Sequence, residues 1–442
     1  MISAQSEIPR LTNRTWLMTV LVGVYASNFV DRMILNVLQQ PIKAELHLQD
    51  WQLGMLSGTT FAFFYAFLGL YVARVAEHGD RTKVAAACIL LWSVMTAICG
   101  FATQFFHLLL LRIGVAVGEA GATPTGQSLI SDYYEPEKRA GALAIFQSGN
   151  TLGHVLGAVL GGVVGQAWGW RWAFIIAGAP GLILAALMLF TIREPRRMAG
   201  AREPVPDLKV VASALFGKRT FRWMALGTAA TLFASYSISS FISPHLMRSY
   251  GVSLQTAGLL GGVGGGLMLG VGTLIGGFSA QALARSDRSW LLRVPGITLL
   301  AAGPLCVLTF SGLALEVTIT AFLLMNLCVG TFQGPVFAIN HSLVSARMRA
   351  TASAILLLLI TLGGLGLGPL LIGIASDRLA SMSFGGENFA TVCAGGSSPL
   401  EACALASAEG LRLALISCCL VFAFAGICFL RSTRTIAADV LD

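Results

Sequence analysis

Four charged residues lie inside long apolar segments in the first third of the chain, where charge is least expected. Asp31 and Arg32 are adjacent within the apolar run 16–40, and Arg112 and Glu119 lie within the run 107–130. A charge inside a membrane-spanning helix costs at least about 2.5 kcal/mol, so such residues are functional candidates. Guanidinium groups bind phosphate or carboxylate through paired hydrogen bonds, whereas a buried carboxylate can carry a proton.

These properties assign roles to the four residues. Arg32 and Arg112 are candidate anion-binding residues, and a lysine at either position should impair function. Glu119 is the candidate proton carrier, poised by Arg112 and the Asp31–Arg32 pair, with Asp31 as the second candidate. At about 1.5 Å per residue, Asp31 lies about 15 Å, Arg112 about 8 Å and Glu119 about 18 Å from the outer ends of their helices. Burial favours the protonated, neutral form of Glu119, whereas a nearby guanidinium favours its ionised form. Movement of one helix against the other could therefore switch its protonation.

The alternative is an ion-pair network that only locks helices together. Residues 112 and 119 are two helical turns apart and share a face, so they could also form a permanent bridge on one helix. Replacing buried charges by packed apolar groups is often neutral or stabilising where only structure is needed. That principle favours a functional role over a purely structural one.

The deep polar groups in the second half of the chain are neutral, in contrast to the first half. They are Ser235, Tyr236, Ser239, Asn326, Gln333 and Asn340. We expect Tyr236, Asn326 and Gln333 to contact substrate. A site with charge on one wall and neutral or apolar groups on the other suits an amphiphile, with its head group at Arg32 and Arg112.

The composition indicates the environment of these residues. Of 442 residues, 55% are hydrophobic and only 11% are charged, whereas soluble domains carry about 25% charged residues. Most of the chain must therefore face lipid. The net charge of +8 does not indicate nucleic acid binding, because the basic residues lie in short segments between apolar runs and form no basic-aromatic patch.

Twelve apolar runs are long enough to span a bilayer, which takes about 20 residues. They cover residues 16–40, 52–76, 82–103, 107–130, 140–166, 171–192, 221–245, 253–281, 290–312, 316–343, 350–379 and 411–431. The basic break at 193–220 divides them into two sets of six, and a second break covers 380–410. We therefore predict an all-α membrane protein with a six-helix bundle at 1–192, a cytoplasmic linker at 193–220 and a second six-helix bundle at 221–442.

The basic residues predict the orientation. With both termini in the cytoplasm, inside segments contain 21 of the 29 Lys and Arg residues and outer loops contain five, including Lys43 and Arg248. Basic residues accumulate on the cytoplasmic side of membrane proteins. We expect an integral, multi-pass protein of a bacterial inner membrane.

Short sequence matches and glycine spacing relate the two halves. Arg139-Ala-Gly-Ala-Leu-Ala recurs as Arg349-Ala-Thr-Ala-Ser-Ala, 210 residues later, and Asp80-Arg recurs as Asp287-Arg, 207 residues later. Equivalent offsets at equivalent topological points indicate a diverged repeat. Glycines spaced by four in the fifth run and clustered in the eighth and eleventh predict close helix packing.

Over its whole length the chain resembles the major facilitator superfamily, with a 6+6 helix arrangement and a basic middle linker. Residues 73–82, Ala-Arg-Val-Ala-Glu-His-Gly-Asp-Arg-Thr, are similar to that family's G-x-L-A-D-R-x-x-R-R motif, with Glu77, His78 and Thr82 as departures. Residues 169–174, Gly-Trp-Arg-Trp-Ala-Phe, match a further family element. Residues 28–32 and 112–120 resemble the spinster branch.

The resemblance implies a pseudo-symmetric fold in which the first and fourth helices line a central cavity. It also implies a transporter that works by alternating access on an amphiphilic lipid such as a lysophospholipid or sphingoid phosphate, with proton coupling. By the same resemblance, a cluster of four cytoplasmic residues is a latch that ties the halves together when the transporter opens outward. These residues are Glu77, Asp80, Arg81 and Arg139.

Cysteine spacing and the absence of enzyme motifs complete the prediction. Cys393 and Cys403 lie in the predicted outer loop, where an oxidising compartment favours a disulfide, and the other seven cysteines lie in helices without metal-ligand spacing. Because enzyme motifs are lacking, we expect a transporter that is not an enzyme, with no cofactor and no metal. We also expect it to be a monomer. The open alternatives are an exporter of drugs or organic anions and, in another class, a non-transporting receptor or scaffold.

Overall fold

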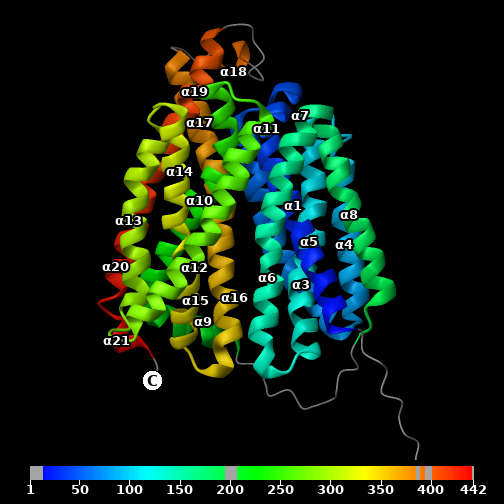
Figure 1. The fold of residues 1–442 in the computed structure, drawn as a ribbon, viewed down its shortest axis with the longest axis vertical. Helices are drawn as coiled ribbons and strands as arrows, with labels where there is room; N and C mark the ends of the chain where they lie inside the picture. Colours follow the sequence, from blue (N-terminus) through cyan, green and yellow to red (C-terminus); the bar gives the residue numbers. More distant parts are fainter. Residues whose placement is uncertain (1–12, 195–206, 385–388, 394–400, 441–442) are drawn as a thin grey trace, which may run out of the picture.

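The computed structural model describes residues 13–194, 207–384, 389–393 and 401–440. Within these ranges the chain is helical and contains no strand. The helices stand side by side in two bundles (Figure 1). We call the end with α18 (Phe389–Val392) the upper end, and the end with α9 (Leu208–Gly217) and α21 (Ile436–Asp439) the lower end, as they are drawn there.

The first bundle contains six long helical segments, two of which include a π-helical turn (η). In chain order its elements are α1 (Arg14–Leu46), α2 (Asp50–Gly54), η1 (Met55–Thr59), α3 (Thr60–His78), α4 (Arg81–Cys99), α5 (Phe105–Tyr133), α6 (Pro136–Val159), η2 (Leu160–Val164), α7 (Gly165–Trp168) and α8 (Trp170–Thr191).

The second bundle follows α9 and has the same plan. Its elements are α10 (Arg219–Tyr250), α11 (Leu254–Ala257), η3 (Gly258–Gly264), α12 (Gly265–Ala284), α13 (Trp290–Phe310), α14 (Leu315–Gly330), α15 (Gln333–Ser342), the 3-10 turn η4 (Ala346–Met348), α16 (Arg349–Ile360), η5 (Thr361–Gly366), α17 (Gly368–Phe384), α18, α19 (Glu401–Ile416), α20 (Cys418–Ser432) and α21.

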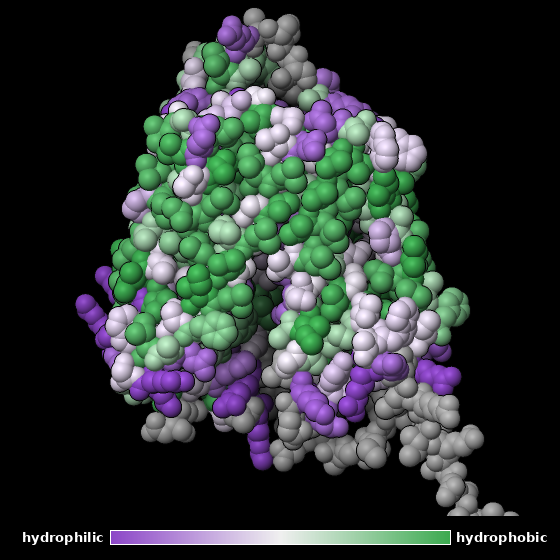
Figure 2. Space-filling view, viewed as in Figure 1, coloured by the Kyte–Doolittle hydropathy of each residue, from purple (hydrophilic) through white to green (hydrophobic). Residues whose placement is uncertain are grey.

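The apolar surface confirms the prediction of a membrane protein. Eleven helical segments of the described chain are long and apolar enough to cross a membrane, and the remaining predicted run, 52–76, falls on α2, η1 and α3. Large apolar side chains point outward, for example Phe190, which is 81% exposed, and Leu420, which is 72% exposed. Figure 2 shows a hydrophobic belt between two polar rims, which is the surface that a bilayer requires.

Two predicted boundaries are wrong. α1 continues through Pro41 to Leu46. Pro41 removes only one backbone hydrogen bond of the helix, and packing against neighbouring helices keeps the segment helical. Asp31 therefore lies about 22 Å from the end of its helix rather than about 15 Å. The predicted break at 380–410 is also shorter: α17 reaches Phe384, and the last spanning segment begins at Glu401, because the alanines and leucines after residue 401 favour helix.

Glycines bring the helices close together, as the sequence predicts. A Cβ on Gly153 would collide with the backbone of α1 at Ala26, and one on Gly54 would collide with the carbonyl of Pro369 in the other bundle. The second, fifth, eighth and eleventh segments each contain a π-helical turn, η1, η2, η3 and η5. These turns lie where the bundles meet, since η3 contacts α6 and η1 contacts η5.

The predicted repeat is also visible in the turns. Asp80 accepts hydrogen bonds from the backbone N–H of Thr82 at 3.0 Å and from its hydroxyl at 2.5 Å. Asp287 accepts the same two bonds from Ser289, at 2.8 and 2.5 Å. Each aspartate thus forms the same turn before an equivalent helix of its half, as expected for a diverged duplication.

Hydrogen bonds join the two bundles at the upper end. The N–H of Leu254 donates to Gln166 across the seam at 3.1 Å, and Arg248 donates to Gln40 at 2.8 Å. Toward the lower end, the space-filling surface is hollowed between the bundles (Figure 2). The molecule is thus closed by direct bonds at one end and parted at the other.

Candidate substrate and proton site

The four predicted charges form two ion pairs between α1 and α5. Arg112 Nη1 donates to Asp31 Oδ2 at 2.5 Å, and Arg32 Nη2 lies 2.8 Å from Glu119 Oε2. The four residues lie together in the structure, but the alternative of a Glu119–Arg112 bridge on one helix does not occur. Residues seven apart on α5 are about 10 Å apart along its axis, so each pairs more closely with a residue of α1.

The Asp31–Arg112 pair is fully enclosed. The two side chains are 3% and 2% exposed, and the Thr96 hydroxyl of α4 donates to Asp31 Oδ1 at 2.6 Å. Both oxygens of Asp31 therefore have a partner. Sequence reasoning missed Thr96, because a lone threonine in an apolar helix gives no signal of what it faces.

The Arg32–Glu119 pair is different because one member reaches open space. The Arg32 side chain is 23% exposed, whereas Glu119 is 0% exposed. The Arg32 Nε also donates to Glu119 Oε2, at 2.9 Å, and Glu119 Oε1 has no partner among the described residues. An unsatisfied buried carboxylate oxygen is costly, so this site is not optimised for stability alone.

Aromatic rings surround the Arg32 guanidinium. Its central carbon lies 4.2 Å from the centroid of the Phe61 ring, 5.1 Å from that of Phe29 and 5.3 Å from that of Tyr65. Such cation–π contacts contribute about 0.5–2 kcal/mol each. Tyr236 of the second bundle and Tyr65 both pack against the apolar cluster that includes Phe61, so both bundles contribute to this site. The sequence did not predict the rings, because the helices are apolar on several faces and their rotation cannot be read from periodicity.

The other residues predicted to contact substrate, Arg112, Asn326 and Gln333, do not join the Arg32–Glu119 pair in this structure. Arg112 is buried against Asp31, so the predicted clamp of two arginines is not formed in this conformation. Asn326 donates to the carbonyl of Phe322 at 2.9 Å, on its own helix. Gln333 begins α15 and is partly exposed. Among the described residues, no hydrogen bond or ion pair joins Asn326 or Gln333 to the charges of the first bundle.

The predicted cytoplasmic latch has other partners in this structure. Arg81 pairs with Glu194 at 2.5 Å and with Asp132 at 2.6 Å, and Arg139 donates to the carbonyl of Tyr134 at 3.0 Å. All of these partners belong to the first half of the chain. The side chain of Glu77 lies outside the described residues.

Asp80 has a local role in this region. Its carboxylate caps α4 through the N–H groups of Thr82 and Lys83. Partial burial raises the pKa of Asp80, but the hydrogen bond from the Thr82 hydroxyl, together with the two N–H bonds, outweighs that effect and holds the pKa below its usual value.

The upper end contains a charge cluster that the sequence did not reveal. Asp50 pairs with Lys43 at 2.7 Å and, through both its oxygens, with Arg248 at 2.7 Å. Asp377 of α17 accepts the backbone N–H groups of Asp50 at 3.0 Å and of Trp51 at 2.8 Å. The prediction that Lys43 and Arg248 are ordinary loop charges is wrong, since their side chains are 6% and 5% exposed. We call Lys43, Asp50, Arg248 and Asp377 the upper seal.

The two predicted disulfide cysteines also lie at the upper end. Cys393 and Cys403 are bonded to each other, and both are buried. The bond connects the segment after α18 to the first turn of α19. No group of three or more His, Cys, Asp or Glu residues that could hold a metal ion occurs in the described part of the chain.

Comparisons with known proteins agree with this architecture. The Major Facilitator Superfamily matches residues 21–369. Two crystal structures of a bacterial homologue of the human lysosomal transporter spinster, inward-facing and either occupied or unoccupied, share 31% sequence identity with this chain. They superpose with TM-scores of 0.87 and 0.88, over 97% of this chain and 98% of the other.

Curated relatives give the same result. An MFS-type efflux pump of Mycolicibacterium smegmatis is 35% identical over 81% of this chain and 84% of its own length. Protein spinster homolog 1 of Xenopus tropicalis is 25% identical over 81% of this chain and 72% of its own length. The chain therefore belongs to the Major Facilitator Superfamily and is a membrane transporter of the spinster type.

Proposed function

We propose that this transporter moves an anionic, lipid-like amphiphile, such as a lysophospholipid or sphingoid phosphate, and couples that movement to protons. The observation that carries the proposal is the ion pair between Arg32 and Glu119. Its guanidinium is partly exposed, while its carboxylate is buried with one oxygen unpartnered. An anionic head group that binds Arg32 would compete with Glu119 for the same donors.

This competition couples binding to protonation. Without Arg32, Glu119 would be a buried charge with no counter-ion, a state that costs about 3–5 kcal/mol. Glu119 would avoid that cost by taking up a proton. Departure of the anion returns Arg32 to Glu119, and the proton leaves. Asp31 is the second candidate for this role, although its two oxygens already have partners.

The surroundings of Arg32 favour an amphiphile over a small polar solute. Three aromatic rings contact the guanidinium, so a ligand that reaches it must pass apolar surface. Tyr236 faces the same region from the second bundle. In the proposed substrate complex, Arg112 becomes available when α5 shifts, and Asn326 and Gln333 offer neutral hydrogen bonds to the rest of the head group.

We also propose an orientation and a conformational state. The lower end faces the cytoplasm of a bacterium with both termini inside, and the parted bundles (Figure 2) represent the inward-facing state. Support comes from the basic residues of the linker and from the similarity to inward-facing structures of the spinster homologue. Residues 1–192 and 221–442 then move as two bodies around the linker 193–220. In the outward-facing state, Asp80, Arg81 and Arg139 would form the latch.

Export of a drug or small organic anion is the second candidate function. It is favoured by the 35% identity to the efflux pump of M. smegmatis. A cis,cis-muconate transport protein of Acinetobacter baylyi, 25% identical over 64% of this chain, favours a small organic anion as substrate without indicating the direction of transport. Both candidates require an anion or amphiphile at Arg32, so the substrate itself must be tested.

Flux measurements in proteoliposomes test the proposal. We expect uptake of a fluorescent lysophospholipid that rises with an imposed pH gradient and exceeds uptake of ethidium or muconate. Glu119→Gln should still bind the lysolipid but lose the response to the gradient. Glu316→Gln, at an exposed acid on α14, is the matched control and should behave as wild type. Gradient-driven transport by Glu119→Gln at the wild-type rate would contradict the coupling, and preferential transport of ethidium or muconate would favour the exporter.

A further inference from the structure

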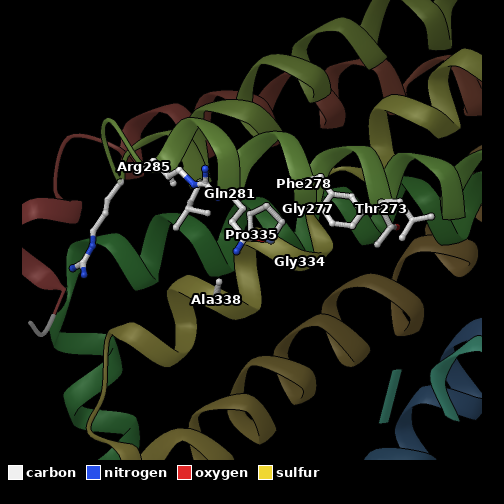
Figure 3. A pocket seen from close by; sticks show the side chains of 12 residues that line it. Thr273, Gly277, Phe278, Gln281, Arg285, Gly334, Pro335 and Ala338 are labelled. Carbon is white, nitrogen blue, oxygen red and sulfur yellow. The ribbon is translucent and has the colours of Figure 1, made fainter. Parts of the chain in front are cut away.

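A groove on the second bundle lies apart from the Arg32 site. It has a volume of about 640 Å³ and runs between α12, α13 and α15 toward the lower end (Figure 3). Its walls are mainly apolar and include Phe278, whose ring is 72% exposed. Its lower end is lined by Gln281, Arg285 and Arg288. The groove thus joins an apolar trough to a basic mouth.

The groove begins where α12 loses contact with α6. A Cβ on Gly262 would collide with Ala158 of α6, one on Gly266 would lie 3.6 Å from His154, and one on Gly270 would reach Thr151 only at 4.0 Å. About two turns after Gly270 on the same face of α12, a Cβ on Gly277 would meet no atom within 4 Å. The glycine face of α12 that packs against α6 nearer the upper end therefore forms the floor of an open groove nearer the lower end.

Two glycines leave this floor without side chains. A Cβ on Gly334 of α15 would meet only the Cα of Gly277, at 3.7 Å. Both residues have ordinary helical backbone, so a side chain at either position would enter the groove rather than strain the fold. The groove can therefore be filled by substitution without a clash.

The mouth of the groove is positively charged. Arg285 follows directly after α12, is exposed and has no ion-pair partner among the described residues. The nearby acid Asp287 is engaged by Ser289 and by Arg293, at 3.2 Å. Exposed arginines at the ends of membrane helices commonly lie at the depth of the lipid head groups, and Arg285 has this position at the end of the apolar groove.

We propose that this groove is a binding site for an anionic phospholipid of the adjacent leaflet. The phosphate binds Arg285 and Arg288, with Gln281 as an additional donor, and an acyl chain lies against Phe278 above the two glycines. Basic pockets between membrane helices hold anionic head groups in this way. The lining of the groove includes neither Arg32 nor the residues that contact it, and lipid binding there does not depend on what the transporter carries.

Native mass spectrometry with defined lipids tests this proposal. Protein incubated with phosphatidylglycerol should retain one molecule above the level seen with phosphatidylethanolamine. Removing one basic residue should weaken retention about fivefold, and Arg285→Gln with Arg288→Gln should weaken it about thirtyfold. Gly334→Leu, which changes no charge, should also abolish retention by filling the trough. Arg222→Gln is the matched control, since Arg222 is exposed at the lower end of α10 outside the groove.

The outcomes separate a specific site from general attraction. Equal retention of the two lipids, or undiminished retention in both Gly334→Leu and the double arginine variant, would overturn the proposal. An equal loss in Arg222→Gln would also overturn it, because the effect would then be one of net charge. If the double arginine variant does not fold, Gly334→Leu and Gly277→Leu decide the matter, and size-exclusion profiles report their folding.

Discussion

Neutralising Asp377 should open the upper end of the transporter. The Asp377 carboxylate lies on the second bundle and accepts two backbone N–H groups at the start of α2 in the first, at 3.0 and 2.8 Å. A carboxylate at this point is favoured both by the charged hydrogen bonds and by the helix dipole. Because both bonds cross the seam, they exist only while the upper end is closed.

The size of the effect follows from the bonds lost in Asp377→Asn. The asparagine oxygen can keep one N–H, while its amide group cannot accept the other. A hydrogen bond to a charged group contributes about 1.5–3 kcal/mol. The ratio of closed to open upper ends should therefore fall roughly tenfold to a hundredfold. The remaining bonds of Asp50 to Lys43 and Arg248 keep a fraction of the molecules closed.

Distance measurements between spin labels can detect this shift. Labels at Trp168 and Leu313, both exposed near the upper end and in different bundles, should show a longer distance in Asp377→Asn. The seven free cysteines are replaced first, and the disulfide is kept. Glu316→Gln is the control, since it removes an exposed acidic charge from the same end. A distance distribution unchanged from wild type would refute the role of the two bonds.

Three further predictions concern other parts of the chain. Arg32→Lys should lower lysolipid uptake severalfold while leaving thermal stability near wild type, because lysine lacks the planar fork; uptake near the wild-type rate would make Arg32 a mere counter-ion. Mass spectrometry of unreduced protein should find Cys393 and Cys403 joined, and recovery of both in alkylated form would contradict the bond. Cysteines introduced into 193–220 should be labelled only from the cytoplasmic side, and labelling from outside would reverse the orientation.

The sequence predicted the spanning helices well because length and apolar composition are local properties. It failed where the end of a helix depends on its neighbours, as at Pro41 and after residue 380. Those errors had a consequence for the upper seal. With the first helix ended at residue 40, Lys43 looked like a loop residue, although it is buried against Asp50.

The charged site was predicted in its members but not in its pairing. Depth along an apolar helix can be estimated from residue number, and it put the four charges in the same part of the membrane even though the end of the first helix was misplaced. Which arginine meets which carboxylate depends on how α1 and α5 are rotated about their axes. Apolar residues surround these helices on several sides, so their sequence carries little information about rotation. The ring of Phe61 above Arg32 was missed for the same reason.

The two ion pairs should differ in what they contribute to stability. Asp31 has a partner for each oxygen and faces an arginine that is only 2% exposed. Asp31→Asn would leave Arg112 buried without a counter-ion, which should cost about 3–5 kcal/mol of unfolding free energy.

Glu119→Gln should be much milder. It frees an arginine that is 23% exposed and already rests on aromatic rings, so solvent and the rings can compensate. We therefore expect the thermal midpoint in detergent to fall clearly in Asp31→Asn and little in Glu119→Gln. The opposite order would mean that Arg32 and Glu119 form the structural lock, and that Asp31 is the better candidate for the proton carrier.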